Sequence, residues 1–70
     1  MVPLGLLADG EAAEIVSVSG AAAPAARAVG LQAGVRVRVL ANGGGPVLVK
    51  IDGARIAVDR GVAMRITVRT

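Results

Sequence analysis

Apart from two methionines, the apolar side chains of this chain are small or branched, and none carries an aromatic ring. Its 70 residues include no Phe, Tyr or Trp, whereas Val, Leu, Ile and Ala contribute 12, 6, 4 and 14 residues. Aromatic rings normally supply the largest buried areas of a protein core. Without them, gaps must be closed by tight interdigitation of small side chains, which favours a closed sheet with a narrow interior.

The middle of the chain has the clearest strand pattern. Val35, Val37 and Val39 alternate strictly with Arg36 and Arg38. A period of two places the valines on one face of a strand and the arginines on the other. We therefore predict a strand here, with the valines pointing inward and the arginines pointing outward.

A second alternating run, over residues 47–51, leads into Asp52-Gly53. This dipeptide is typical of a two-residue type I′ hairpin, because both central residues need positive φ. Such a loop brings apolar residues together on one face, but it places Lys50 opposite Arg55 and so sets like charges side by side. The predicted partners are Ile51 with Ala54, Lys50 with Arg55, Val49 with Ile56, and Val47 with Val58.

Three further elements complete the pattern. Glu11–Ser19 is predicted as a first strand, and its impure alternation indicates a β-bulge. Pro24–Val29 is rich in Ala and precedes Gly30, so we predict one or two helical turns with a glycine C-cap. Residues 64–68 alternate as a last strand after a turn at Gly61. Five short strands with one apolar face close most economically as a small all-β barrel, with one short helix after the first strand.

The whole of residues 1–70 is expected to form this single domain, because we find no linker and no internal repeat. The apolar lead-in Leu4–Asp9 is expected to pack on the barrel. Leu4, Leu7 and Leu31 either plug the ends of the barrel or contact a partner.

Residues that carry chemistry are scarce. Cys and His are both absent, so the chain has no disulfide framework, no thiolate or imidazole metal site and no imidazole base. Asp9, Glu11 and Glu14 offer oxygen ligands that a hard cation accepts, but we interpret them as a solvated acidic lead-in. We predict no metal and no cofactor.

Neither catalytic motif that the sequence suggests is complete. Ser17 and Ser19 lack a His partner, and a Ser–Lys dyad would have to use Lys50, the only lysine. The three glycines at 43–45 precede Pro46, not the Gly-Lys-Ser/Thr of a phosphate loop. We interpret the glycines as a flexible connection and expect that the protein is not an enzyme.

No segment is apolar over the roughly 20 consecutive residues that a membrane-spanning helix requires. The longest uncharged stretch lies between Glu14 and Arg27 and is interrupted by serines, a glycine and a proline. Met1–Asp9 has no basic region and no cleavage site of the kind found in signal peptides. We expect a cytoplasmic protein that does not insert into the membrane, in keeping with the absence of Cys.

Charge is distributed unevenly along the chain. Residues 1–14 carry −3, and residues 15–70 carry +6. The outward-facing bases either form a basic face for an acidic surface or nucleic acid, or simply keep the protein soluble. Because no aromatic platform exists for base stacking, we expect no nucleic-acid partner. The bases in question are Arg36, Arg38, Lys50, Arg55, Arg65 and Arg69.

Taken in order, these segments resemble the FeoA family, the ferrous iron transport protein A type, over nearly the whole chain. The chain departs from the family pattern in two places. Ala33 replaces the usual Pro before the corner Gly34, and the helix before the corner is mostly Ala where the family usually has Arg and Leu. The matching residues are Leu4, Leu7 and Gly10, Ala13–Val18, Gly20, Val29–Val37, Val49–Gly53, Ile56–Val58, Ala63 and Ile66–Val68.

The resemblance implies an SH3-like barrel and a function. Such a protein would be a small cytosolic accessory or regulator of a bacterial ferrous iron transport system, in contact with the cytoplasmic G-protein (GTPase) region of the membrane iron permease. On this interpretation the loops and the Gly30-Leu31 corner dock on the partner. The expected contact residues are Arg27, Leu31, Arg36, Arg38 and Arg55.

Two alternatives stay open at this point. The chain also suits a freestanding relative of the C-terminal SH3-like domain of iron-dependent repressors, or a small barrel that binds nucleic acid. Binding to nucleic acid would weaken steeply with salt, because phosphate contacts release counterions.

Overall fold

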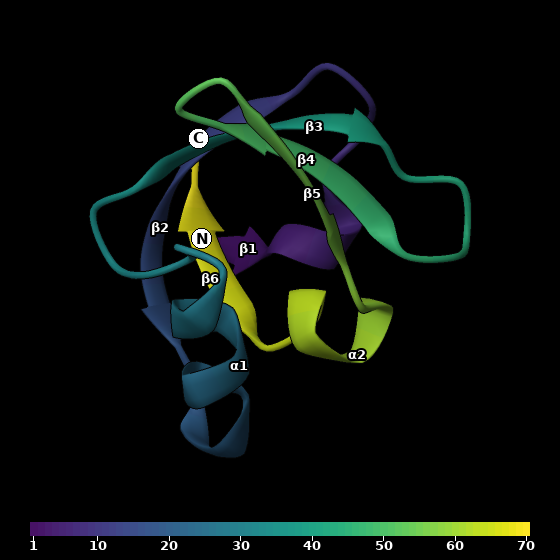
Figure 1. The fold of residues 1–70 in the computed structure, drawn as a ribbon. Coiled ribbons are helices and arrows are strands. Elements are labelled where there is room, and N and C mark those ends of the chain that lie inside the picture. Colours follow the sequence, from purple (N-terminus) through teal and green to yellow (C-terminus); the bar gives the residue numbers. More distant parts are fainter.

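One antiparallel sheet of six strands makes up most of the structure, a computed structural model that describes residues 1–70. The sheet curls around an apolar interior, with two short helices packed at one side (Figure 1). Its strands lie in the order β1-β6-β2-β3-β4-β5. The elements are β1 (Val2–Pro3), the 3-10 turn η1 (Leu4–Leu6), β2 (Ala12–Val18), the 3-10 turn η2 (Gly20–Ala22), α1 (Ala23–Ala28), β3 (Arg36–Ala41), β4 (Val47–Ile51), β5 (Ala54–Val58), α2 (Arg60–Ala63) and β6 (Ile66–Arg69).

The predicted hairpin is confirmed in every pair. β4 and β5 match residue for residue from Ile51 with Ala54 to Val47 with Val58. Asp52 and Gly53 both have positive φ, at 44° and 81°, which the type I′ turn requires. The register follows from the turn, because its length fixes which residues face each other.

The valine strand and the first strand are also confirmed. In β3, Val37 and Val39 are buried while Arg36 and Arg38 are exposed. The register of β2 against β6 shifts between Ile15 and Ser17, which is the bulge that the impure alternation indicates.

The predicted all-β fold with a short helix after the first long strand is confirmed. The structure differs from the predicted five-stranded closed barrel in two details. A sixth strand, β1, pairs Val2 with Val68 and Pro3 with Thr67. The sheet is also open, because the edge strands β1 and β5 do not pair with each other. A two-residue strand containing proline has no alternation to detect, so only its long-range pairing defines it.

The segment before the last strand also differs from the prediction. Residues 60–63 form the helical turn α2 where only a turn at Gly61 was expected, and β6 begins at Ile66. The side chain of Asp59 caps α2 by accepting a hydrogen bond from Gly61 N at 3.0 Å. Met64 therefore belongs to the end of this helix and is 41% exposed.

α1 lies within one residue of its predicted bounds, with proline in its first turn. Gly30 closes it with a φ of 89°, the left-handed conformation typical of a glycine C-cap. Leu31 N then donates to Ala26 O at 2.9 Å. This turn directs the chain back toward the sheet.

The core consists only of aliphatic side chains. Fifteen buried residues form a single cluster, and no polar or charged side chain is buried. Leu4, Leu7 and Leu31 belong to it, with exposures of 0%, 4% and 1%. These leucines therefore fill the interior, as expected for residues that plug the ends of a barrel.

A group of polar contacts, the Asn42–Arg60 clamp, fastens the lead-in to the sheet. Asn42 Nδ2 donates to Gly5 O at 2.9 Å and to Leu7 O at 2.7 Å. Arg60 Nη2 donates to Asn42 Oδ1, and its Nε donates to Gly44 O and Gly45 O at 3.1 and 3.0 Å. The glycine loop is therefore held by hydrogen bonds that no local pattern indicates.

Candidate partner-binding surface

The five expected contact residues fall in two separate regions. Arg27 and Leu31 line a pocket beside α1, which we call the helix pocket. Arg36 and Arg38 line a hollow on the outer face of the sheet, the basic hollow. Arg55 lies two strands from Arg38, with Lys50 between them.

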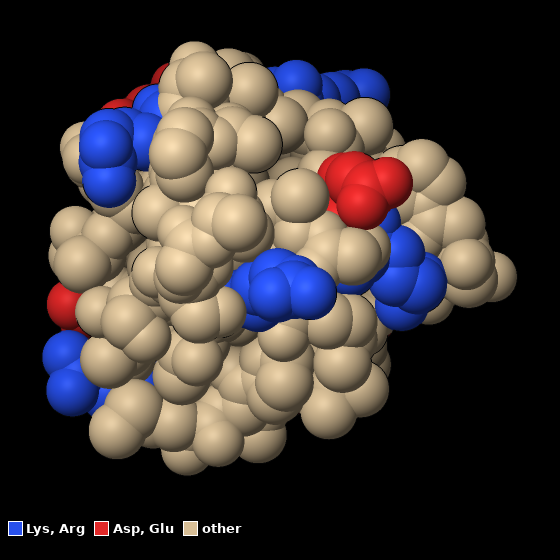
Figure 2. All heavy atoms as spheres, turned by 90° about the horizontal axis from the view of Figure 1, so that it is seen from below, with Lys and Arg blue, Asp and Glu red and all other residues tan.

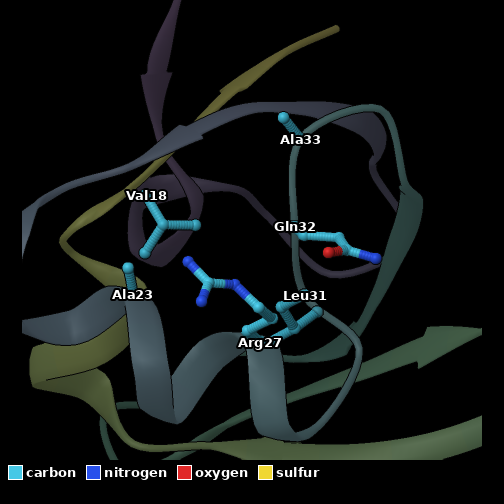
Figure 3. A pocket seen from close by; sticks show the side chains of 6 residues that line it. All are labelled: Val18, Ala23, Arg27, Leu31, Gln32 and Ala33. Carbon is cyan, nitrogen blue, oxygen red and sulfur yellow. The ribbon is translucent and has the colours of Figure 1, made fainter.

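The helix pocket has a volume of about 300 Å³ and one charged side chain, Arg27 (Figure 3). The Arg27 guanidinium extends from α1 toward Val18 and Ala23. The loop after the helix supplies the opposite wall, with Gln32 and Ala33. Four of the six lining residues are hydrophobic, so the pocket suits an apolar group next to a negative one.

The side chain of Leu31 forms part of the floor of this pocket, not an exposed contact. It is 1% exposed and belongs to the core cluster. The turn at Gly30 points it into the interior. The Leu31 side chain, predicted as a partner contact, therefore offers almost no surface to a partner.

Three basic side chains lie in register across the outer face of the sheet. Arg38 on β3 pairs with Lys50 on β4, and Lys50 pairs with Arg55 on β5. We call these three residues the basic row. Like charges at directly opposite positions destabilise a sheet. The basic row therefore lowers the stability of the sheet and concentrates positive charge on its outer face.

No ion pair neutralises the basic row. The only ion pair of the structure joins Arg69 to Glu14 at 3.3 Å, on the β6–β2 side of the sheet. Arg38 Nη1 donates to Gly10 O at 2.7 Å, and the side chains of Lys50 and Arg55 make no hydrogen bond at all.

The basic hollow has a volume of about 320 Å³. Arg36 adds a further positive charge to it, but Arg36 pairs with Glu14 in the sheet and Asp52 lines the same hollow. Lys50 lines this hollow too, so Arg55 is the one base of the row that neither shares the hollow with Asp52 nor makes a side-chain hydrogen bond.

The face that carries the helices differs from the basic row. Figure 2 shows the molecule from below, the side on which α1 and α2 lie in Figure 1. Most of this face has no charged side chain, and the bases on it stand apart from one another. The molecule thus has one largely uncharged side and a basic row elsewhere.

The three acidic residues of the lead-in do not gather. Asp9 Oδ1 accepts a hydrogen bond from Asn42 N at 2.7 Å, and Glu11 Oε1 accepts one from Ala8 N at 2.7 Å. Glu14 pairs with Arg69. No group of three potential metal ligands occurs in the structure.

No helix has the length and hydrophobicity needed to cross a membrane.

A sequence model of the FeoA domain matches residues 2–70. The chain belongs to the FeoA domain family. A Methanocaldococcus jannaschii protein named "Putative Fe(2+) transport protein A" is 33% identical to this FeoA domain over 70 residues, which cover 97% of this chain and 85% of that one. The family resemblance drawn from the sequence is thereby confirmed.

Solved FeoA structures have the same fold as this FeoA domain. The crystal structure of an iron uptake regulatory protein, FeoA, matches with a TM-score of 0.92 and 31% identity over 97% of this chain and 95% of that one. The zinc complex of Stenotrophomonas maltophilia FeoA, described as an SH3 domain protein, matches with a TM-score of 0.85 and 30% identity over 99% and 91%. The expected SH3-like fold is confirmed.

The alternative drawn from the sequence named iron-dependent repressors, and part of a manganese-dependent repressor is similar to this chain. A manganese-dependent transcriptional repressor matches this FeoA domain with a TM-score of 0.85 and 27% identity. The match covers 94% of this chain but only 39% of the repressor. One SH3-like fold is thus shared by FeoA proteins and by part of a repressor.

Proposed function

We propose that this FeoA domain is a cytoplasmic accessory protein of a ferrous iron transport system and acts by binding the cytoplasmic G-protein region of an iron permease. Its membership of the FeoA family supports the link to ferrous iron transport. The observation that carries the binding role is the uncompensated basic row on the outer face of the sheet. A surface of this kind favours an acidic partner surface and speeds the encounter with it.

The contact residues of this proposal are Arg27, Arg36, Arg38 and Arg55. Arg36 and Arg55 are exposed, and neither makes a side-chain hydrogen bond or ion pair, so both are available to a partner. Arg27 adds a charge beside the apolar helix pocket. The contact with the permease would therefore be a protein–protein interface without a reactive group.

Binding of this protein to the purified cytoplasmic domain of the permease tests the proposal. We expect Arg36→Glu and Arg55→Glu each to weaken the complex roughly tenfold at low salt, mainly through a slower association rate. Arg65→Glu is the matched control, because Arg65 is exposed and lies outside both the basic row and the basic hollow. Equal affinity of the permease domain for the unmodified protein and the three variants would show that the basic surface is not part of the interface.

A salt titration with RNA and duplex DNA separates the nucleic-acid alternative. Affinity for either that falls steeply as salt rises, together with no affinity for the permease domain, would contradict the proposed function.

A further inference from the structure

The edge strand β5 leaves hydrogen-bonding groups of its backbone without partners. β5 pairs only with β4, and no other hydrogen bond of the structure involves residues 54–58. The opposite edge of the sheet, β1, has only two residues. β5 is therefore the longer of the two open edges.

The hairpin register identifies the free groups. In a two-residue hairpin the residues that flank the turn form a hydrogen-bonded pair, and bonded and non-bonded pairs then alternate along the strands. Ile51 and Ala54 are the flanking pair, so Lys50–Arg55 and Leu48–Ala57 are non-bonded pairs. The N–H and C=O groups of Arg55 and Ala57 consequently point away from β4, toward the open edge.

Two surfaces meet at this edge. On the outer face, the basic row runs across the sheet and ends at Arg55. Beside the same edge, between β5, α1 and α2, lies an apolar groove of about 150 Å³, which we call the edge groove. Seven of its eight lining residues are hydrophobic: Ala25, Ala26, Val29, Leu31, Ala57, Val58 and Val62, with Asp59 as the eighth.

We propose that β5 accepts an extended segment of a partner protein as an additional strand, and that this segment alternates acidic and apolar side chains. Backbone groups of the segment would bond to Arg55 and Ala57, as in other cases of strand addition to a sheet edge.

The side-chain pattern of the added strand follows from the period of two. A residue opposite Arg55 shares the outer face with the basic row, so an acidic side chain fits there. The residues next to it in the segment lie opposite Ala54 and Ile56 on the inner face, where Ile56 packs against the core and an apolar side chain fits. Val58, farther along the same face of β5, lines the edge groove. Positive charge on the outer face and apolar residues on the inner face of β5 thus specify one partner chemistry.

A second copy of this chain is a poorer occupant of the edge. Pairing β5 with β5 of another molecule would place two Arg55 side chains on the same outer face, where they repel. A charged residue on an edge strand also discourages such self-association.

Synthetic peptides test the inference independently of the permease. The probe is an acetylated and amidated seven-residue peptide that alternates valine and glutamate. One control peptide carries lysine in place of glutamate, and another carries the same glutamates with methylated backbone nitrogens. Amide hydrogen exchange of the full chain, followed by NMR, is the readout that a purely electrostatic contact would not change.

We expect the Arg55 and Ala57 amides to exchange rapidly in the free protein, because they point to the open edge, and the glutamate peptide to bind and to slow their exchange. Arg55→Glu should weaken binding roughly five- to tenfold and reverse the preference between the glutamate and lysine peptides. Ala57→Pro should abolish binding, because it removes an outward donor that the ladder with β4 does not use. Arg65→Glu should leave binding unchanged.

Four outcomes would overturn the inference. Binding without protection of these two amides, or equal binding of the N-methylated peptide, would reduce the contact to charge attraction. Concentration-dependent protection of the same amides without peptide would identify a second copy as the occupant. If neither the glutamate nor the lysine peptide binds and the fold is intact, Arg55 serves only to discourage pairing of the edge strand with another chain.

Discussion

At the residue scale, a chain without aromatic rings depends on each large aliphatic side chain that it buries. Eight of the large side chains are less than 2% exposed, Leu31 among them. Leu31 also contributes to the floor of the helix pocket and to the edge groove. Its role at these sites is thus to shape their walls from within the core.

We expect Leu31→Ala to lower the free energy of unfolding by about 3 kcal/mol, because it removes transfer energy and leaves a cavity. Leu6→Ala is the matched control: Leu6 is 64% exposed, and its loss should change stability by less than about 0.5 kcal/mol. Urea unfolding followed by circular dichroism measures both. Similar losses for the two variants would contradict the assignment of Leu31 to the core.

At the scale of elements, local periodicity and turn chemistry account for what could be predicted. The alternation around Val37 gives both the strand and its outward arginines, and Asp52-Gly53 gives the register that sets Lys50 opposite Arg55. The basic surface of the candidate site could therefore be predicted from the sequence.

Features that depend on distant partners were not predictable in this way. β1 exists because Val2 meets Val68, and the Asn42–Arg60 clamp joins residues 18 positions apart in the sequence. Neither leaves a periodic signal. The open edge of β5 belongs to the same class, since only the complete strand order shows which strand lacks a neighbour.

The clamp carries its own prediction. Asn42→Ala removes two donors from the carbonyls of Gly5 and Leu7 and the acceptor of Arg60. We expect a loss of about 2 kcal/mol in the free energy of unfolding. Combining it with Arg60→Ala should cost less than the sum of the two single losses, because the residues share one network. Strict additivity in a double-mutant cycle would show that the two side chains act separately.

At the scale of the whole molecule, charge is arranged at the expense of stability. The net charge is +3, yet three bases adjoin one another in the basic row while the only ion pair lies elsewhere. Repulsion of this kind between exposed groups is screened by salt. We therefore expect a substitution that relieves this repulsion to raise the stability of the fold and to weaken the binding of an acidic partner.

We expect Lys50→Glu to raise the free energy of unfolding by about 0.5 to 1 kcal/mol at low salt, because a central acid would attract Arg38 and Arg55. The gain should shrink at high salt, and affinity for an acidic partner should fall. Thermal unfolding at the two ionic strengths measures the first effect, and the permease-domain assay measures the second. A stability gain that does not depend on salt would point to a cause other than charge.

The antiparallel pairing of β1 with β6 has a topological consequence. Because Val2 lies opposite Val68, the two ends of the chain approach each other across a single strand spacing. A short peptide bridge between them would give a ring-shaped polymer that keeps every native contact. Such a cyclic backbone has fewer conformations to lose on folding, and cutting it at another surface loop would give a circular permutant of the same fold.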